Sequence, residues 1–277
     1  MRKLIFILAV LACPPAYSNE IYINQSGDFL WQDVIQDGDD NQIKGISQTD
    51  MKLDGDYNVM INHQWGDNHL QEVEVDGNSN YTVIAQGGGG NNNSAQVSVT
   101  GANNYTGVFQ GFHYDGFGFY QDTDETGGHE AFVTTTGDYN SHMSTQTDTN
   151  RGGGGGSPHH LANIYNGDFN TVEHIQMGKA GHDGFVEIQG DDNTVDLLQR
   201  GNGGQKWADI VLTGDDHTVD VDQRGSNSAS ATIDLTNSGG AYNFTLTQNV
   251  TTSADSYSVT GYCTNSSGCS LSVNRNN

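Results

Sequence analysis

The chain has 277 residues and carries 34 Asp and Glu against 10 Lys and Arg, a formal net charge of −24 at pH 7. A chain this acidic repels nucleic-acid phosphates and anionic membranes, which argues against nucleic acid as a partner. Hydrophobic residues make up 34% of the chain, and it has 37 glycines but only 3 prolines. This composition cannot fill a conventional core of that length, so an ordered fold needs a thin, repetitive and partly polar interior.

Residues 1–18 have the pattern of a secretory signal peptide. Arg2 and Lys3 precede an apolar run at 4–11, and Ala16 and Ser18 precede a cleavage point ahead of residue 19. The run is too short to span a membrane. We therefore expect the mature chain to begin at residue 19 and to be exported. Cys13 leaves open a second interpretation, a lipoprotein cleavage site.

From residue 19 onward the chain repeats one frame, in which a glycine is followed by Asn three residues later and by Gln nine residues later. Six units keep all three positions, and they begin at Gly55, Gly77, Gly101, Gly137, Gly167 and Gly190. Four weaker units, which begin at Gly27, Gly214, Gly239 and Gly261, keep part of the frame. The chain therefore contains about ten repeats, and from Gly55 onward the glycines are 22 to 25 residues apart wherever no insertion intervenes.

The residues on either side of each glycine alternate with period two. Val73 and Val75 would face one way while Glu72 and Glu74 face the other, as in a half-buried strand. Each repeat thus reads as strand, glycine turn, strand. One such unit cannot bury its apolar face alone, so neighbouring repeats must stack. The predicted fold is all-β: a β-solenoid of about ten strand-turn-strand repeats (β-arches) over residues 19–273, followed by a C-terminal tail at 274–277.

Stacking would superimpose the Asn and Gln of successive repeats about 4.8 Å apart, where side-chain amides can hydrogen-bond along the stack. The predicted ladder and polymerisation residues are Asn58, Gln64, Asn80, Gln86, Asn104, Gln110, Asn140, Gln146, Asn170, Gln176, Asn193, Gln199, Gln223 and Gln248. The predicted turn residues are Gly55, Gly77, Gly101, Gly137, Gly167, Gly190 and Gly214.

This frame resembles the curlin repeat of bacterial curli subunits, whose core is Gln-x-Gly-x-x-Asn-x-Ala-x-x-x-Gln. Gln25 supplies the first Gln, and in later units its place is taken by residues such as Leu53, Val75 or Thr135. The resemblance covers roughly residues 20 to 273. It implies an extracellular amyloid of stacked β-arches, secreted unfolded through an outer-membrane pore. The implied partners are further copies of the chain, the curli-type secretion pore and a nucleator subunit.

Two units are stretched by insertions at 111–129 and 148–160. The first is aromatic and glycine-rich, and the second carries Arg151 followed by five glycines. Both are expected to be loops that leave the solenoid at turns, since a strand cannot gain so many residues without losing register. The second loop would include the pair His159 and His160. The first is either a spacer or a surface-adhesion patch.

The predicted turns are rich in aspartate, which accepts backbone hydrogen bonds in turns. Paired acids on successive repeats repel one another unless a divalent cation bridges them, so Asp191, Asp192, Asp215 and Asp216 are calcium candidates. No other cofactor and no repeated histidine ligand spacing is found. Cys263 and Cys269 lie in the last unit, where they either close a small disulfide loop or remain free thiols.

Three classes of function follow. The first is a structural subunit, or a nucleator, of an extracellular curli-like amyloid fibre used in biofilm matrix and surface adhesion. The second is a monomeric secreted β-helical adhesin or a carbohydrate- or ice-binding protein. The third, an enzyme, is disfavoured because the chain has too few Lys and Arg to build the groove of a polysaccharide lyase. We therefore expect no catalytic site.

Overall fold

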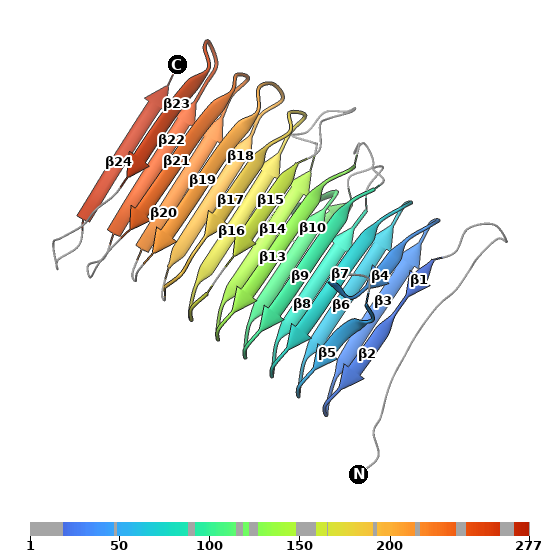
Figure 1. The fold of residues 1–277 in the computed structure, drawn as a ribbon. Helices are drawn as coiled ribbons and strands as arrows, with labels where there is room; N and C mark the ends of the chain where they lie inside the picture. Colours follow the sequence, from blue (N-terminus) through green and yellow to red (C-terminus); the bar gives the residue numbers. More distant parts are fainter. Residues whose placement is uncertain are drawn as a thin grey trace.

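The computed structural model describes residues 19–46, 49–87, 92–114, 119–121, 127–147, 159–164, 166–190, 193–213, 217–236, 242–260 and 269–276. These residues form two long parallel sheets that lie against each other as the two walls of a flat solenoid (Figure 1). The predicted β-solenoid is confirmed. The segment 1–18 lies outside the described residues. No helix in the described part is long and apolar enough to cross a membrane.

The first sheet has 12 strands. They are β1 (Glu20–Ile21), β2 (Ile23–Ser26), β4 (Gln42–Lys44), β5 (Met51–Asp54), β7 (Leu70–Asp76), β9 (Ser94–Thr100), β13 (Glu130–Thr136), β15 (His160–Ile164), β17 (Asp183–Glu187), β19 (Lys206–Thr213), β21 (Ala229–Thr236) and β23 (Asp255–Thr260).

The second sheet has 10 strands. They are β3 (Trp31–Asp37), β6 (Val59–Trp65), β8 (Tyr81–Gln86), β10 (Tyr105–Gln110), β14 (Ser141–Thr147), β16 (Thr171–Met177), β18 (Thr194–Arg200), β20 (His217–Arg224), β22 (Tyr242–Asn249) and β24 (Cys269–Asn276).

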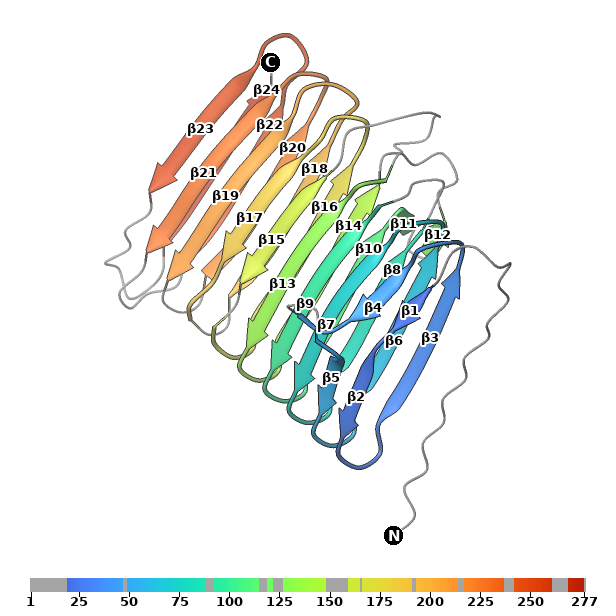
Figure 2. The same cartoon turned by 45° about the vertical axis from the view of Figure 1, so that its right-hand side comes forward.

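Each regular coil contributes one strand to each sheet, and the turns gather along two edges of the solenoid (Figure 2). The coils from β7 and β8 to β23 and β24 follow this rule. In the two coils that precede them, the strand of the first sheet is divided, into β1 and β2 and into β4 and β5. The predicted ten repeats are therefore eight regular turns and two interrupted ones.

The strands stack in register, so each interior position meets its own copy. In β9 the buried residues Ala95, Val97 and Val99 alternate with partly exposed Gln96 and Ser98, as the sequence pattern predicts. The apolar interior falls into two clusters, one in the coils before β15 and one in the coils after it. Between them the interior is polar and includes the buried residues His142 and His174.

The first edge of the solenoid consists of glycine turns that stack directly on one another. Gly77 has φ +121°, a conformation that side chains rarely adopt, and a Cβ there would lie 1.8 Å from the carbonyl oxygen of Gly101 in the next coil. Gly55 and Gly101 make the same close approach to the following glycine. These turns need glycine both for their backbone conformation and for the spacing between coils.

The first insertion contains secondary structure of its own. Strands β11 (Phe112–Tyr114) and β12 (Phe119–Gln121) pair as a small antiparallel sheet outside the solenoid. The Phe112 side chain is buried, and its ring lies 5.5 Å from the ring of Trp65 in an edge-on arrangement. This part of the insertion is therefore packed against the second sheet.

Three predicted boundaries are wrong. His129 and His159, which were assigned to the loop insertions, are fully buried in the solenoid interior, and His160 is the first residue of β15. The predicted tail at 274–277 begins too early because β24 continues to Asn276 and pairs along its whole length with β22. β15 and β24 extend into these segments because their neighbours β13 and β22 offer backbone hydrogen bonds.

We predict that Gly77→Ala lowers the free energy of unfolding by more than about 2 kcal/mol, because the new Cβ forces adjacent coils apart and strains φ. Ser79→Gly in the same turn is the control, since Ser79 has φ 58° and glycine tolerates it. This control should change stability by less than about 1 kcal/mol. Thermal and urea unfolding measure both variants, and equal effects would contradict the stacking argument.

Candidate functional site: the interior ladders

A continuous glutamine ladder crosses the interior of the solenoid. Each side-chain Nε2 donates to the Oε1 of the glutamine in the following coil at 2.7 to 3.1 Å. The members in order are Gln36, Gln64, Gln86, Gln110, Gln146, Gln176, Gln199, Gln223 and Gln248. All bonds run in the same direction along the solenoid axis.

The same glutamines also join the two sheets. Gln110 Nε2 donates at 3.0 Å to the backbone carbonyls of Ser94 and His129, at the start of strands in the first sheet. Gln146 repeats this with the carbonyls of Glu130 at 2.9 Å and His159 at 3.0 Å. A buried amide is thus satisfied by its own copy and by the opposite wall, as a polar residue in a core must be.

The asparagine rank combines amide-to-amide bonds, as the sequence predicts, with bonds to the turn backbone. Asn104, Asn170 and Asn193 each donate Nδ2 to the Oδ1 of the preceding member at 3.0 to 3.2 Å. Asn80 Oδ1 accepts the backbone N–H of Asn104 at 3.0 Å, and Asn80 Nδ2 donates to the carbonyl of Gly101 at 2.8 Å. Asn58, Asn104, Asn140 and Asn170 make the same bonds. Each Asn therefore binds the turn backbone of the next coil, because those N–H and C=O groups lie at the corner where the strand ladder ends.

A second polar rank lies at the opposite edge, and sequence reasoning missed it. Its buried members are Asn41, His69, Asn93, His129, His159, His182 and Lys206. In each step the side chain accepts the backbone N–H of the next member, at 2.9 to 3.3 Å. The imidazole rings stack with centroids 4.9 Å apart between His129 and His159 and between His159 and His182.

A weak signal for this rank exists in the sequence. Six units carry a second glycine eleven residues after the first: Gly38, Gly66, Gly88, Gly178, Gly201 and Gly225. An Asn or His follows the first two of these by three residues. Insertions obscure the spacing in the other coils, and three different residue types share the position, so the pattern is not visible without the register.

Hydrogen bonds fix the tautomer of these histidines. His159 Nδ1 accepts the N–H of His182 at 3.1 Å, so it carries no proton, and Nε2–H donates to the Thr147 carbonyl at 3.2 Å. His182 makes the same pair of bonds, with the N–H of Lys206 at 3.3 Å and the Met177 carbonyl at 3.1 Å. Protonation of Nδ1 would place two donors face to face and break a bond between coils.

Burial opposes the charged form of the interior histidines. It lowers the pKa of His182 to about 4 and the pKa of His159 well below its usual value, with neighbouring rank members adding to the effect. Burial also lowers the pKa of His142 and His174 to about 3. The rank ends at Lys206, whose Nζ donates to the carbonyls of Gly203 and Gly204 and whose pKa is lowered to about 8 by burial.

The aspartates of the first edge are held by backbone N–H groups. Asp56 Oδ1 accepts the N–H of Asp28 at 2.7 Å, and Asp168 Oδ1 accepts that of Asp138 at 2.6 Å. Each carboxylate therefore reaches the preceding coil, and this bond offsets part of the repulsion between stacked acids.

Several predicted site residues cannot be placed. The calcium candidates Asp191, Asp192, Asp215 and Asp216 lie outside the described residues, as do Gly214 and Cys263. Within the described residues no group of three or more His, Cys, Asp or Glu side chains is arranged to hold a metal ion. In the last coil the register pairs Gln248 with Arg275, so Arg275 occupies the position that the repeat spacing assigns to Ser270.

Fold and ladders together define a stacked β-arch repeat protein. Residues 190–225, which span β18, β19 and β20, match the curlin associated repeat. This match supports the assignment of the chain to the curlin-repeat family. No curated protein and no solved structure matches the chain.

We predict that Gln146→Ala destabilises the solenoid by more than about 2 kcal/mol. It removes four hydrogen bonds, those with Gln110, Gln176 and the carbonyls of Glu130 and His159, and it leaves Gln176 Oε1 without its donor. A buried unpaired group costs about 1–3 kcal/mol. Gln96→Ala is the matched control, because Gln96 faces outward from β9. Urea unfolding should show the control within about 0.5 kcal/mol of wild type. Equal losses would contradict a structural role for the ladder.

We predict that the solenoid loses stability as the pH falls from about 6.5 towards 4. The unfolded histidines bind protons below pH 6.5, whereas His159 and His182 have depressed pKa values when folded, so their stabilising contribution is present above 6.5 and lost below it. Each such residue contributes at most about 1.4 kcal/mol per pH unit. The raised pKa values of Asp196 and Asp220, due first to burial, act in the opposite direction nearer pH 4.

The measurement is the unfolding midpoint at constant ionic strength between pH 7.5 and 4.5. The informative variant is His159→Asn with His182→Asn, since Asn93 already fills the same rank and accepts the His129 N–H at 3.0 Å. The variant should unfold like wild type at pH 7.5 but show a shallower decline below 6.5. If the unfolding midpoint of the variant falls below pH 6.5 as steeply as that of wild type, other groups cause the pH effect.

Proposed function

We propose that this chain is a structural subunit, or a nucleator, of an extracellular curli-like amyloid fibre on a bacterial surface. The observation that carries the proposal is the pair of open ends. Among the described strands, β3 at one end pairs with β6 alone, and β24 at the other end pairs with β22 alone. An unpaired parallel strand is a template for another chain.

The interior supports the same proposal at the β3 end, where Gln36 is the first member of the glutamine ladder. At the other end the ladder stops one coil before β24, because Arg275 lies at the register position of Gln248, whose Nε2 is buried without an acceptor. A further copy stacked on either end extends both sheets by the same backbone pairing. The proposed role is structural and non-catalytic. The proposal also includes a leader peptide at 1–18 and export through an outer-membrane pore, and the curlin-type repeat is the basis for both.

The acidic charge opposes growth. Asp196 and Asp220 stack in register on the outer face of β18 and β20. Screening has a Debye length of about 8 Å at physiological ionic strength, which exceeds the spacing of about 4.8 Å between coils. Added chains therefore repel the fibre end through their acidic ranks, and salt relieves that repulsion.

We predict that preformed fibres remove the lag phase of assembly and that elongation accelerates between 20 and 200 mM NaCl, on the order of severalfold. Thioflavin fluorescence follows the reaction. Ser272→Pro in β24 should slow elongation, because the register directs the Ser272 N–H away from β22 and proline cannot donate to an incoming strand. Ser272→Thr, which keeps the N–H, should elongate like wild type. Absence of seeding would reject the fibre and favour the alternative, a monomeric secreted adhesin.

A further inference from the structure

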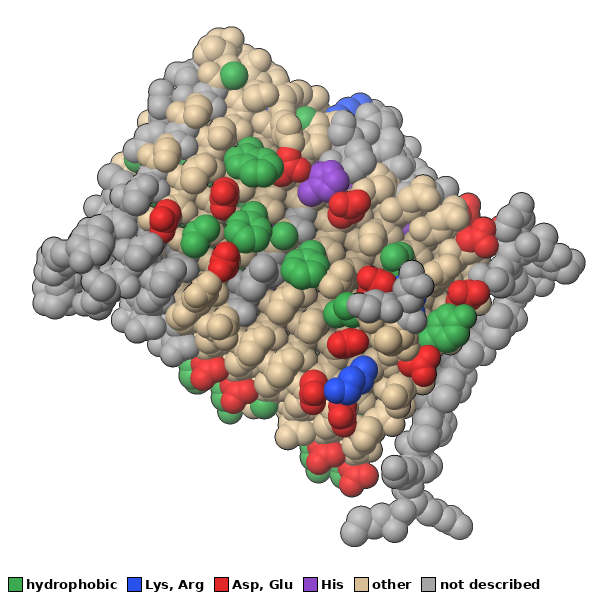
Figure 3. Space-filling model, viewed as in Figure 1, with side chains coloured by type: hydrophobic (Ala, Val, Ile, Leu, Met, Phe, Trp, Pro, Cys, Tyr) green, Lys and Arg blue, Asp and Glu red, His purple; other side chains and the backbone are tan. Residues whose placement is uncertain are grey.

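The outer face of the first sheet carries a shallow groove near its middle. Hydrophobic and acidic side chains and a histidine gather on this face (Figure 3). The groove has a volume of about 460 Å³ and is lined by side chains of β9, β13, β15, β17 and β19. The interior ladders and the coil ends contribute nothing to its lining. It is a separate feature of the solenoid, independent of the proposed fibre growth.

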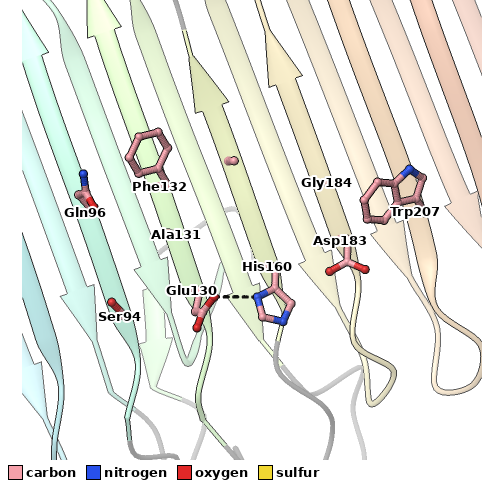
Figure 4. A pocket seen from close by; sticks show the side chains of 10 residues that line it. Ser94, Gln96, Glu130, Ala131, Phe132, His160, Asp183, Gly184 and Trp207 are labelled. Atoms are coloured by element: carbon pink, nitrogen blue, oxygen red, sulfur yellow. Dashed lines mark hydrogen bonds and ion pairs between the residues drawn. The ribbon is translucent and has the colours of Figure 1, made fainter.

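Strand register arranges the groove in two rows. One row runs Glu130, His160, Asp183, Trp207 across adjacent strands, and the next row contains Phe132 followed by Ala162. Ala162 is the small residue after Phe132, so it forms the floor of the hollow. Figure 4 shows the Phe132 and Trp207 rings on opposite sides, with Glu130, His160 and Asp183 below them.

The groove presents acceptors and aromatic surface. Its carboxylates belong to Glu130 and Asp183, and no lysine or arginine lines it. His160 Nδ1 lies 2.9 Å from Glu130 Oε2, which holds both side chains in place. Trp207 is 44% exposed, so its ring is available to a ligand. Neighbouring strands are about 4.8 Å apart, which places Phe132 and Trp207 on strands about 14 Å from each other.

These features select the class of ligand. The strands β13, β15, β17 and β19 are each paired on both sides, so a peptide cannot add to the groove as a further strand. A ligand must instead use the ring faces and the carboxylates. An amino sugar offers the apolar face of a pyranose for aromatic stacking, and an ammonium group for the carboxylates and the tryptophan ring. Several linked units span the distance between the two rings.

We propose that this groove binds an oligosaccharide of glucosamine units with free amino groups. Phe132 and Trp207 stack on sugar faces at the two ends, and Glu130 and Asp183 accept hydrogen bonds from ammonium groups between them. A fibre would display the groove once per subunit along its side, so the function of binding such a glycan is additional to assembly.

The test is isothermal titration of the purified full chain with the β-1,4-linked glucosamine hexamer at pH 6.5. We expect saturable binding, with at least about tenfold loss of affinity in Trp207→Ala and in the double variant Glu130→Gln with Asp183→Asn. Trp31→Ala is the matched control, since Trp31 is 67% exposed on the second sheet, and it should bind like wild type. Far-ultraviolet circular dichroism verifies that each variant is folded, and Trp207→Leu replaces Trp207→Ala should the latter lose strand content.

Two competing ligands complete the design. The N-acetylated hexamer lacks the charge, and hexalysine has the charge without sugar rings, so both should bind at least about tenfold more weakly. Absence of saturable binding, equal binding of either competitor, or equal loss in Trp31→Ala would overturn the proposal. None of these outcomes bears on seeded fibre growth, which is measured without glycan.

Discussion

Parallel stacking in register is the constraint on which the structure depends, because it places every side chain about 4.8 Å from its counterpart in the next coil. A buried polar residue is then tolerated only if it can both donate and accept along the axis. Gln, Asn and neutral His meet this condition, and they occupy the interior polar ranks that run through many coils. Lys206 can only donate, and the histidine rank ends there, with its ammonium group held by turn carbonyls.

The same constraint explains how the chain carries so many acids. Carboxylates cannot satisfy one another, so at the first edge the turn aspartates bind backbone N–H groups of the preceding coil, as Asp56 binds Asp28. On the outer faces Asp196 and Asp220 lie over each other, and their pKa values rise, first through burial and then through repulsion from neighbouring aspartates. Stacked carboxylates therefore lower the stability of the fold mainly where no backbone N–H donates to them.

The sequence predicts the solenoid well because glycine turns and period-two alternation report directly on local geometry. Val73 and Val75 could be placed inward, and Gln199 opposite Gln223, without any structure. The histidine rank could not be found, because Asn93, His129 and Lys206 share one environment while differing in type, and insertions hide their spacing. The groove at Ala162 could not be found either, since it depends on which outward residues of five adjacent strands become neighbours.

The direction of the glutamine ladder makes the two ends of the solenoid chemically different. Every Nε2 donates toward the C-terminal coil, so reversing one amide would set two donors or two acceptors against each other. In the proposed fibre a copy joined head to tail brings the β24 end of one chain to the β3 end of the next, where the position of Gln36 follows that of Arg275, a residue that can only donate. A head-to-head junction would bring Gln36 against Gln36, acceptor to acceptor, and leave both without a donor. The interior amides thus favour one polarity of growth even though backbone strands alone would allow both.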